Sequence, residues 1–221
     1  MNIFLLRHGM TEGNRQHRYV GSTDEALLPE AVEHLSAAAP VFQKTYLADK
    51  SVLVLTSPLR RCVQTAQLLT AGLSLARGEK SAAEADGRCG SYVSFREVAA
   101  FRETDFGTFE YRNYAELNGD PDYQRFIDSG GETAFPGGES RKEAAERVTA
   151  AFVSQVKLLP APEPDVLLLV VHGGTIMALM ERFAVPRRSF YDWQCANLSG
   201  FTGALVTSPE LKIVEVGKLC L

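Results

Sequence analysis

The sequence is poor in histidine, cysteine and tryptophan, of which its 221 residues contain four, four and one. No two cysteines form a CxxC pair, so a zinc cage or a thioredoxin-like redox motif is not expected. Widely spaced cysteines are typical of reduced thiols, and we expect a cytoplasmic protein. Basic residues are outnumbered, with 23 Lys and Arg against 27 Asp and Glu. The resulting net charge of −4 argues against nucleic-acid binding, which needs a broad basic surface.

Long apolar runs are missing as well. No stretch approaches the roughly 18 apolar residues that a membrane span needs, so we expect no membrane association. The apolar stretch at the N-terminus is short and follows no basic segment, so no signal peptide is expected. The sequence has no GxxxxGK[ST] motif and no clear set of metal ligands, so we expect neither a Walker phosphate loop nor a metal or other cofactor. Its length predicts a single domain over residues 1–221.

Three short apolar runs predict buried strands. They lie at residues 3–6, 52–56 and 166–171. Apolar residues at helical spacing follow or separate these runs, at residues 29–44, 59–74, 139–158 and 175–184. Continuous apolar strands that alternate with helices are typical of a parallel sheet covered on both faces. We therefore predict a three-layer α/β/α sandwich with a mostly parallel central sheet.

Three other segments do not fit this alternation. Residues 203–216 contain two extended runs around a Ser-Pro-Glu turn, which predicts a hairpin at the sheet edge. Residues 76–91 are polar and rich in glycine, which predicts an exposed loop. Residues 105–138 are rich in glycine and proline and are long for a simple connection, so we expect a substrate-side insertion or lid with short helices.

Histidine and arginine gather where the predicted strands end. Arg7 and His8 follow the first strand, Arg61 lies shortly after the second, and His172 follows the third. Ligands of open α/β sheets bind at these carboxyl ends. Arginine side chains and helix N-termini both favour anions, so we predict a pocket for a compact anion such as a phosphoryl group. Without a Walker loop or metal ligands, a histidine that attacks phosphorus is the nucleophile we expect.

The residues at these strand ends belong to longer segments that match a known family. In chain order the segments are Leu6–Asn14 (LRHGMTEGN), Gly21–Asp24 (GSTD), Ser57–Ala66 (SPLRRCVQTA), Glu103–Gly107 (ETDFG) and Val171–Gly174 (VHGG). They resemble the motifs of the histidine phosphatase superfamily, the phosphoglycerate mutase-like family, beginning with its Arg-His-Gly signature. The resemblance is strong because several motifs occur in the family's order over most of the chain. Within this family the chain resembles the phosphatase branch, whose small members include α-ribazole phosphatase-type enzymes.

The resemblance implies a role for each matched residue. His8 would attack phosphorus and carry a phosphohistidine, while Glu103 would give a proton to the leaving oxygen. Arg7, Arg61 and His172 would hold the phosphoryl oxygens and stabilise the transition state.

Substrate binding is implied for Arg7, Asn14, Gly21, Arg61 and Gly173. The family's spacing from Ser57 selects Arg61 over its neighbour Arg60. We expect the other two histidines, His17 and His34, to be non-catalytic.

Three functions stay open on this reading. We favour a metal-independent phosphomonoesterase of the histidine acid phosphatase type, which acts on a small phosphorylated metabolite. A phosphoglycerate mutase that depends on a bisphosphate is the alternative, but Gly174 stands where mutases carry asparagine, and the insertion is acidic rather than basic. A catalytically silent phospholigand-binding protein is the third. Tyr111 replaces a glycine of the family, a change expected to reshape the substrate side of the site, so the relatives' substrates alone do not identify the substrate of this protein. A homodimer also stays open, since Phe190, Tyr191 and Trp193 fit either a packed corner or an interface.

Overall fold

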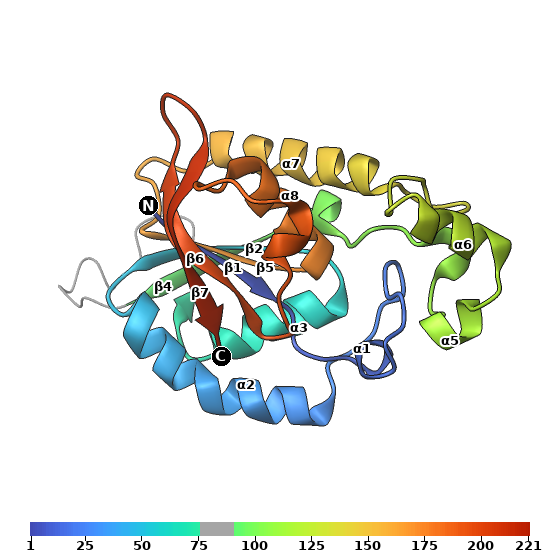
Figure 1. Cartoon of the computed structure of the whole chain (residues 1–221). Helices are drawn as coiled ribbons and strands as arrows, with labels where there is room; N and C mark the ends of the chain where they lie inside the picture. Colours follow the sequence, from blue (N-terminus) through green and yellow to red (C-terminus); the bar gives the residue numbers. More distant parts are fainter. Residues whose placement is uncertain (76–90) are drawn as a thin grey trace.

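The computed structural model describes residues 1–75 and 91–221, and its centre is a seven-stranded sheet with the order β3-β4-β2-β5-β1-β6-β7 (Figure 1). The strands are β1 (Asn2–Arg7), β2 (Ser51–Thr56), β3 (Ser74–Leu75), β4 (Tyr92–Glu97), β5 (Val166–Val171), β6 (Ser199–Val206) and β7 (Lys212–Cys220). The first five strands in the sheet order are parallel, whereas β6 runs antiparallel to β1 and β7 antiparallel to β6. The mostly parallel sheet and the hairpin at its edge are confirmed.

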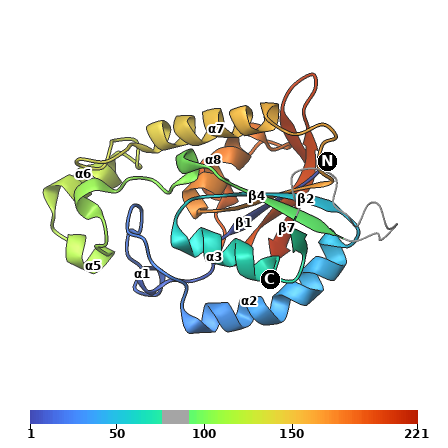
Figure 2. The same cartoon turned by 180° about the vertical axis from the view of Figure 1, so that it is seen from behind.

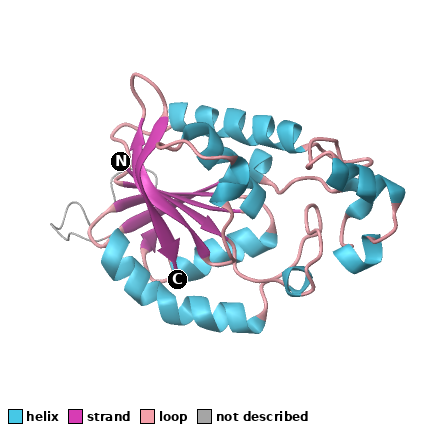
Figure 3. Cartoon of the chain, in the orientation of Figure 1, coloured by secondary structure: helices cyan, strands magenta, loops and turns pink. Residues whose placement is uncertain are grey.

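Helices cover both faces of this sheet (Figures 2 and 3). The main helices are α2 (Pro29–Phe42), α3 (Arg60–Leu69), α7 (Arg141–Lys157) and α8 (Gly173–Phe183). Shorter elements are α1 (Glu12–Arg15), α5 (Tyr114–Leu117), α6 (Pro121–Asp128), a π-helical turn at Gln43–Leu47, and the 3-10 turns η2 (Ala99–Phe101), η3 (Gly107–Phe109) and η4 (Phe190–Trp193). Helices α7 and α8 lie on one face, and α2 and α3 on the other, which confirms the three-layer sandwich.

The strands divide their side chains between the two faces with a period of two. In β1, Ile3 and Leu5 pack with α7 and α8, while Phe4 and Leu6 pack with α2 and α3. Both faces of β5 are fully buried, as the run of six apolar residues predicts. Because each buried Leu or Ile contributes about 1.5–3 kcal/mol, these two cores fix the strand ends firmly.

Two local predictions need correction. The helix predicted over 59–74 is shorter and ends at Leu69, and Gly72 follows with φ +86°, a left-handed conformation that no helix continues through. Strand β4 was not predicted, because its alternation of apolar and polar residues extends only over residues 93–96, and Val93 is its only buried residue. Most of the loop predicted over 76–91 lies outside the described residues.

The segment predicted as an insertion has a small apolar core of its own. It comprises η3, α5 and α6, and it lies beyond the end of the sheet beside the N-terminal end of α7 (Figure 1). Phe109, Leu117, Tyr123 and Phe135 are buried together there. The Asp120 side chain caps α6 at its N-terminus. That this segment acts as a lid stays a prediction.

The aromatic residues of η4 have different surroundings. Phe190 and Trp193 are buried in the main core, whereas Tyr191 is exposed. The first two therefore form a packed corner. A homodimer stays a prediction.

Candidate active site

His8 follows β1 directly and is held by its own backbone. Its amide donates a hydrogen bond to the Val171 carbonyl, across from the end of β5. Its Nδ1 lies 2.7 Å from the Gly9 carbonyl oxygen. Since a carbonyl only accepts, Nδ1 carries the proton and Nε2 keeps its lone pair. Burial and the nearby charges of Arg61 and Arg7 lower the pKa of His8 well below its ordinary value, so the ring is neutral near pH 7.

His172 faces His8 from the end of the neighbouring strand. It lies between β5 and α8, and its ring centroid is 5.2 Å from that of His8. Its Nε2 is 2.8 Å from the Ser57 hydroxyl, which follows β2. Burial and the charge of Arg61 lower the pKa of His172 well below its ordinary value. Three strand ends thus bring two neutral, buried imidazoles together.

Arg61 is completely buried in the first turn of α3. Its guanidinium donates to the carbonyls of Thr23 at 2.7 Å, Gly21 at 3.0 Å and Val20 at 3.2 Å. The Glu110 carboxylate holds the same loop by accepting from the Gly21 and Thr23 amides. Carbonyl groups are the only hydrogen-bond partners of the Arg61 guanidinium in the part of the chain that the structure describes, and a buried cation held by neutral groups alone is costly unless an anion compensates it. This geometry therefore suits an anionic ligand.

Arg60 and Arg61 are adjacent, but only one of them faces the site from α3. Arg60 is exposed, and its amide donates to the Asp24 carboxylate. The structure thus places Arg61, and not Arg60, beside the two histidines.

Arg7 lies next to His8 and contacts residues on the open side of the site. Its Nη1 donates to the Cys195 carbonyl at 2.8 Å, and its guanidinium lies against Gly173. The Nε–H groups of Arg7 and Arg61 are buried and have no hydrogen-bond partner among the described residues. Unpaired buried donors on two arginines favour the binding of an acceptor-rich group.

Glu103 reaches the start of α8 from a segment of irregular backbone. Its Oε1 accepts from the Thr104 amide at 2.9 Å, and its Oε2 accepts from the Gly174 amide at 3.3 Å. Gly174 is in the first turn of α8, two residues after His172 at the N-cap, so the carboxylate lies at the end of the helix that His172 begins. A Cβ atom at position 174 would lie under 3.0 Å from Glu103 Oε1, so the carboxylate occupies the space that glycine leaves.

Asn14 lies in α1, opposite these groups. Its Oδ1 accepts from the Thr11 amide and from Asn197 Nδ2, which is 3.1 Å away. Asn197 Nδ2 also donates to the His8 carbonyl at 3.0 Å. Because donors occupy the Asn14 oxygen, its amide nitrogen is the atom left to donate to a ligand.

A cavity of about 670 Å³ opens at this end of the sheet. Arg7, Asn14, Glu103 and Gly173 line it. Three other predicted site residues, His8, Arg61 and His172, are buried and are not among the residues that line it. Gly21 does not line the cavity. Its backbone holds Arg61 and Glu110, so its contact with a substrate stays a prediction.

The outer part of the cavity is aromatic. Its wall includes Tyr19, Phe106, Phe126 and Phe135, with Tyr191 of η4 opposite Gly131. Phe126 and Phe135 are in contact, with centroids 4.3 Å apart. Four of these five residues lie near or within the insertion, which therefore shapes the outer part of the cavity.

Several site residues were not predicted from the sequence. Ser57 belongs to one of the motifs, but its contact with His172 was not predicted. Asn197 and Arg147, which also lines the cavity, are far from every motif. No local pattern indicates them, because the backbone carbonyls to which they donate lie 44 or more residues away in the chain.

Two negative findings apply to residues 1–75 and 91–221. No three His, Cys, Asp or Glu side chains are grouped there as metal ligands would be. Every helix in the same stretches is too short or too polar to cross a membrane.

Comparison with known proteins gives one family. Residues 3–202 match the histidine phosphatase superfamily (branch 1). Among curated proteins, the chain is 29% identical over 182 residues to a probable phosphoglycerate mutase GpmB of Proteus mirabilis (strain HI4320), covering 81% of this chain and 73% of that protein.

Solved structures show the same fold at lower identity. The putative alpha-ribazole-5'-P phosphatase of Escherichia coli K-12 has a TM-score of 0.75 at 18% identity, covering 96% of this chain and 95% of that one. The alpha-ribazole phosphatase of Shigella flexneri gives 0.74 at 20%, covering 96% and 94%. A phosphoglycerate mutase of Thermus thermophilus gives 0.65 at 24%, covering 100% and 99%.

Proposed function

The chain belongs to the histidine phosphatase superfamily, and we propose that it hydrolyses a small phosphorylated metabolite without a metal, through a phosphohistidine on His8. The hydrogen bond from His8 Nδ1 to the Gly9 carbonyl carries this proposal. It fixes the tautomer in which Nε2 is a nucleophile, and the lowered pKa of His8 keeps that nitrogen unprotonated.

In the first step, the Nε2 lone pair forms a bond to phosphorus as the bond to the leaving oxygen breaks. Glu103 gives its proton to that oxygen, so that a neutral alcohol departs. Arg7 and Arg61 supply positive charge to the phosphoryl oxygens, and His172 and the Asn14 amide add hydrogen-bond donors. The start of α8 contributes free backbone N–H groups and the positive end of its dipole.

In the second step, water attacks the phosphohistidine and the N–P bond breaks. Glu103, now a carboxylate, takes a proton from the water, which regenerates its acid form. Inorganic phosphate leaves, and His8 returns to its neutral state. One carboxyl group thus serves both steps, as microscopic reversibility requires.

The aromatic outer wall supports a substrate class. Tyr19, Phe106, Phe126 and Phe135 offer apolar surface and ring faces to the part of the substrate beyond the phosphate. Such walls bind planar or apolar groups better than short polar chains. α-Ribazole phosphate, which the names of the E. coli and S. flexneri proteins suggest, is the first compound to test.

The pairing of charges in the insertion supports a phosphatase over a mutase. Arg112 is paired with Asp120, and Arg125 with Asp122. No other arginine or lysine lies within residues 105–138, so the insertion has no uncommitted cation for the second phosphate of a bisphosphate. Outside the insertion, Arg18, Arg102 and Arg141 also line the cavity, and each is paired with a glutamate. This pairing favours water over a retained phosphoglycerate as the acceptor of the phosphoryl group.

Phosphate release from an aryl phosphate in the presence of EDTA tests the proposal. We expect turnover by the wild-type protein and its loss in His8→Ala. Equal turnover by the two proteins would rule out His8 as the nucleophile. A panel of phosphorylated metabolites then identifies the substrate. Conversion of 3- to 2-phosphoglycerate that depends on added bisphosphoglycerate would instead establish the mutase.

A further inference from the structure

Glu103 needs support that its own backbone cannot supply. It lies between the turns η2 and η3, and residues 102–106 belong to no helix or strand. Irregular backbone has no repeating hydrogen bonds to fix a side chain. A general acid must nevertheless stay within hydrogen-bond reach of the oxygen it protonates. Other residues must therefore hold this segment in place.

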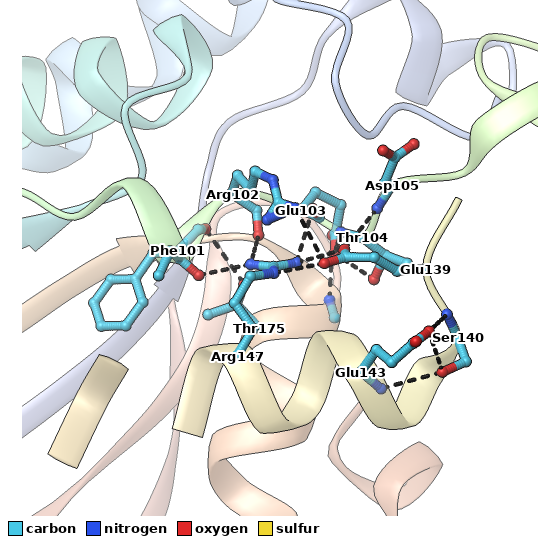
Figure 4. Close-up of polar contacts among 12 residues, drawn as sticks. Phe101, Arg102, Glu103, Thr104, Asp105, Glu139, Ser140, Glu143, Arg147 and Thr175 are labelled. Carbon is cyan, nitrogen blue, oxygen red and sulfur yellow. Dashed lines mark hydrogen bonds and ion pairs between the residues drawn. The ribbon is translucent and has the colours of Figure 1, made fainter. Parts of the chain in front are cut away.

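Arg147 of α7 binds the segment from the side of the helix (Figure 4). Its Nη1 donates to the carbonyls of Ala100 at 2.6 Å and Arg102 at 3.1 Å. Its Nη2 donates to the carbonyl of Glu103 itself at 3.3 Å. One guanidinium thus holds three carbonyls within four consecutive residues.

Glu139 completes the arrangement from the other end. Its two oxygens accept from Arg147 Nε at 2.8 Å and Nη2 at 2.7 Å. It also accepts from the Asp105 amide at 3.0 Å, and its own amide donates to the Asp105 carbonyl at 2.9 Å. Burial favours the protonated carboxyl, but the bonds from Arg147 and Asp105 outweigh it and lower the pKa of Glu139. The Arg147–Glu139 ion pair is therefore charged near neutral pH, and it forms hydrogen bonds to the backbone on both sides of Glu103.

The hydrogen bonds of Arg147 distinguish support from substrate binding. An arginine has five N–H donors, and the five bonds to Glu139, Ala100, Arg102 and Glu103 account for all of them. Although Arg147 lines the cavity, it has no donor left for a phosphoryl oxygen. Its side chain is 17% exposed, and so is that of Glu139, so water competes weakly with these bonds.

We propose that Arg147 and Glu139 are positioning residues, which hold the 100–105 segment so that Glu103 can deliver its proton to the leaving oxygen. The proposal rests on the proposed function, because it assigns Glu103 the acid role. It predicts a defect in proton delivery and not in phosphate binding. The requirement for an acid depends on the leaving group, and this dependence provides the measurement.

The experiment compares kcat/KM for two probes, p-nitrophenyl phosphate and glycerol 2-phosphate. An acidic phenol departs readily without a proton, whereas an alkoxide does not. General acid catalysis contributes about 10²–10⁴-fold, so we expect Arg147→Gln to lose about 10²-fold on glycerol 2-phosphate and only a few-fold on p-nitrophenyl phosphate. Glu103→Gln should show the same selectivity. The double variant should be no worse than Glu103→Gln on the alkyl ester, because both changes remove one function.

Two further variants guard against a folding defect. Arg147→Lys keeps the positive charge but not the planar guanidinium, and it should recover part of the activity that Arg147→Gln loses. Arg96→Gln is the matched control, because Arg96 also donates to α7, through Gln155 at 2.9 Å, but has no hydrogen bond to residues 100–105 among the described residues. It should leave the ratio of the two rates unchanged.

The outcomes separate the two proposals. Equal losses on both probes in Arg147→Gln and Arg147→Lys, or additive losses in the double variant, would overturn the positioning role while His8-dependent turnover stands. If His8→Ala retains wild-type turnover on both probes, the proposed function fails, and the positioning role fails with it.

Discussion

Gly174→Ala offers a sharp test of where Glu103 acts. The added Cβ atom would lie under 3.0 Å from Glu103 Oε1 and 3.3 Å from its Cδ, both too close for an unmoved carboxylate. The Thr104 hydroxyl lies 3.4 Å from the same added Cβ atom and limits the directions in which the carboxylate can move. The carboxylate must therefore shift by a large fraction of an ångström. A misplacement of about 1 Å in a catalytic group can lower the rate about 10²-fold, and we expect a loss of that order in kcat/KM on an alkyl phosphate.

The stability of the same variant should hardly change. Alanine is favoured over glycine inside a helix by about 1 kcal/mol, and position 174 lies in the first turn of α8. The lost hydrogen bond from the Gly174 amide to Glu103 contributes about 1 kcal/mol in the opposite direction. Urea unfolding should thus give a free energy close to that of the wild type, while turnover falls. Wild-type turnover in a well-folded Gly174→Ala protein would refute the assignment of Glu103 to the reacting centre.

Three other predictions concern charge and shape. Stability should fall as the pH drops below 6.5, because burial lowers the pKa of His8 and His172, so that the unfolded chain binds more protons than the folded chain. Each histidine adds about 1.4 kcal/mol per pH unit to the slope of the unfolding free energy against pH. His172→Gln should reduce this slope in urea titrations. Arg61→Met should abolish turnover and, because three buried carbonyls lose their donor, destabilise the fold by about 1–3 kcal/mol in urea unfolding. A variant as stable and as active as the wild type contradicts this prediction. Phe126→Ala should raise KM for an aryl phosphate but not for glycerol 2-phosphate. Phe95→Ala, which changes an exposed residue of β4, should change KM for neither substrate. Equal effects of the two substitutions on KM would contradict a role of the aromatic wall in substrate binding.

The strand ends were predictable because local patterns determine them. Uniform apolar runs mark β1, β2 and β5, and the residues that follow them must meet at one edge of a parallel sheet. The resemblance of the Ser57–Ala66 segment to a family motif implied Arg61, which is buried, rather than Arg60, which is exposed. Both results depend on short stretches of chain.

The support around the site was not predictable in this way. Arg147 holds carbonyls 44 to 47 residues away, and Asn197 binds the His8 carbonyl 189 residues away. Arginine and asparagine at such positions are more often solvated surface residues. Only the fold brings them to their partners. Likewise, the alternation of apolar and polar residues in β4 is too short to identify a half-buried strand, and its pairing with β2 and β3 decides its structure.

Detection of the phosphohistidine tests the central claim most directly. The protein is mixed with a phosphomonoester substrate, quenched in alkali, in which phosphohistidine survives, and analysed by mass spectrometry of its peptides. We expect a phosphoryl group on the peptide that carries His8, lost on acid treatment and missing from His8→Ala. Phosphate release by an active wild-type protein with no such group on His8, or with the group on another residue, would contradict the account.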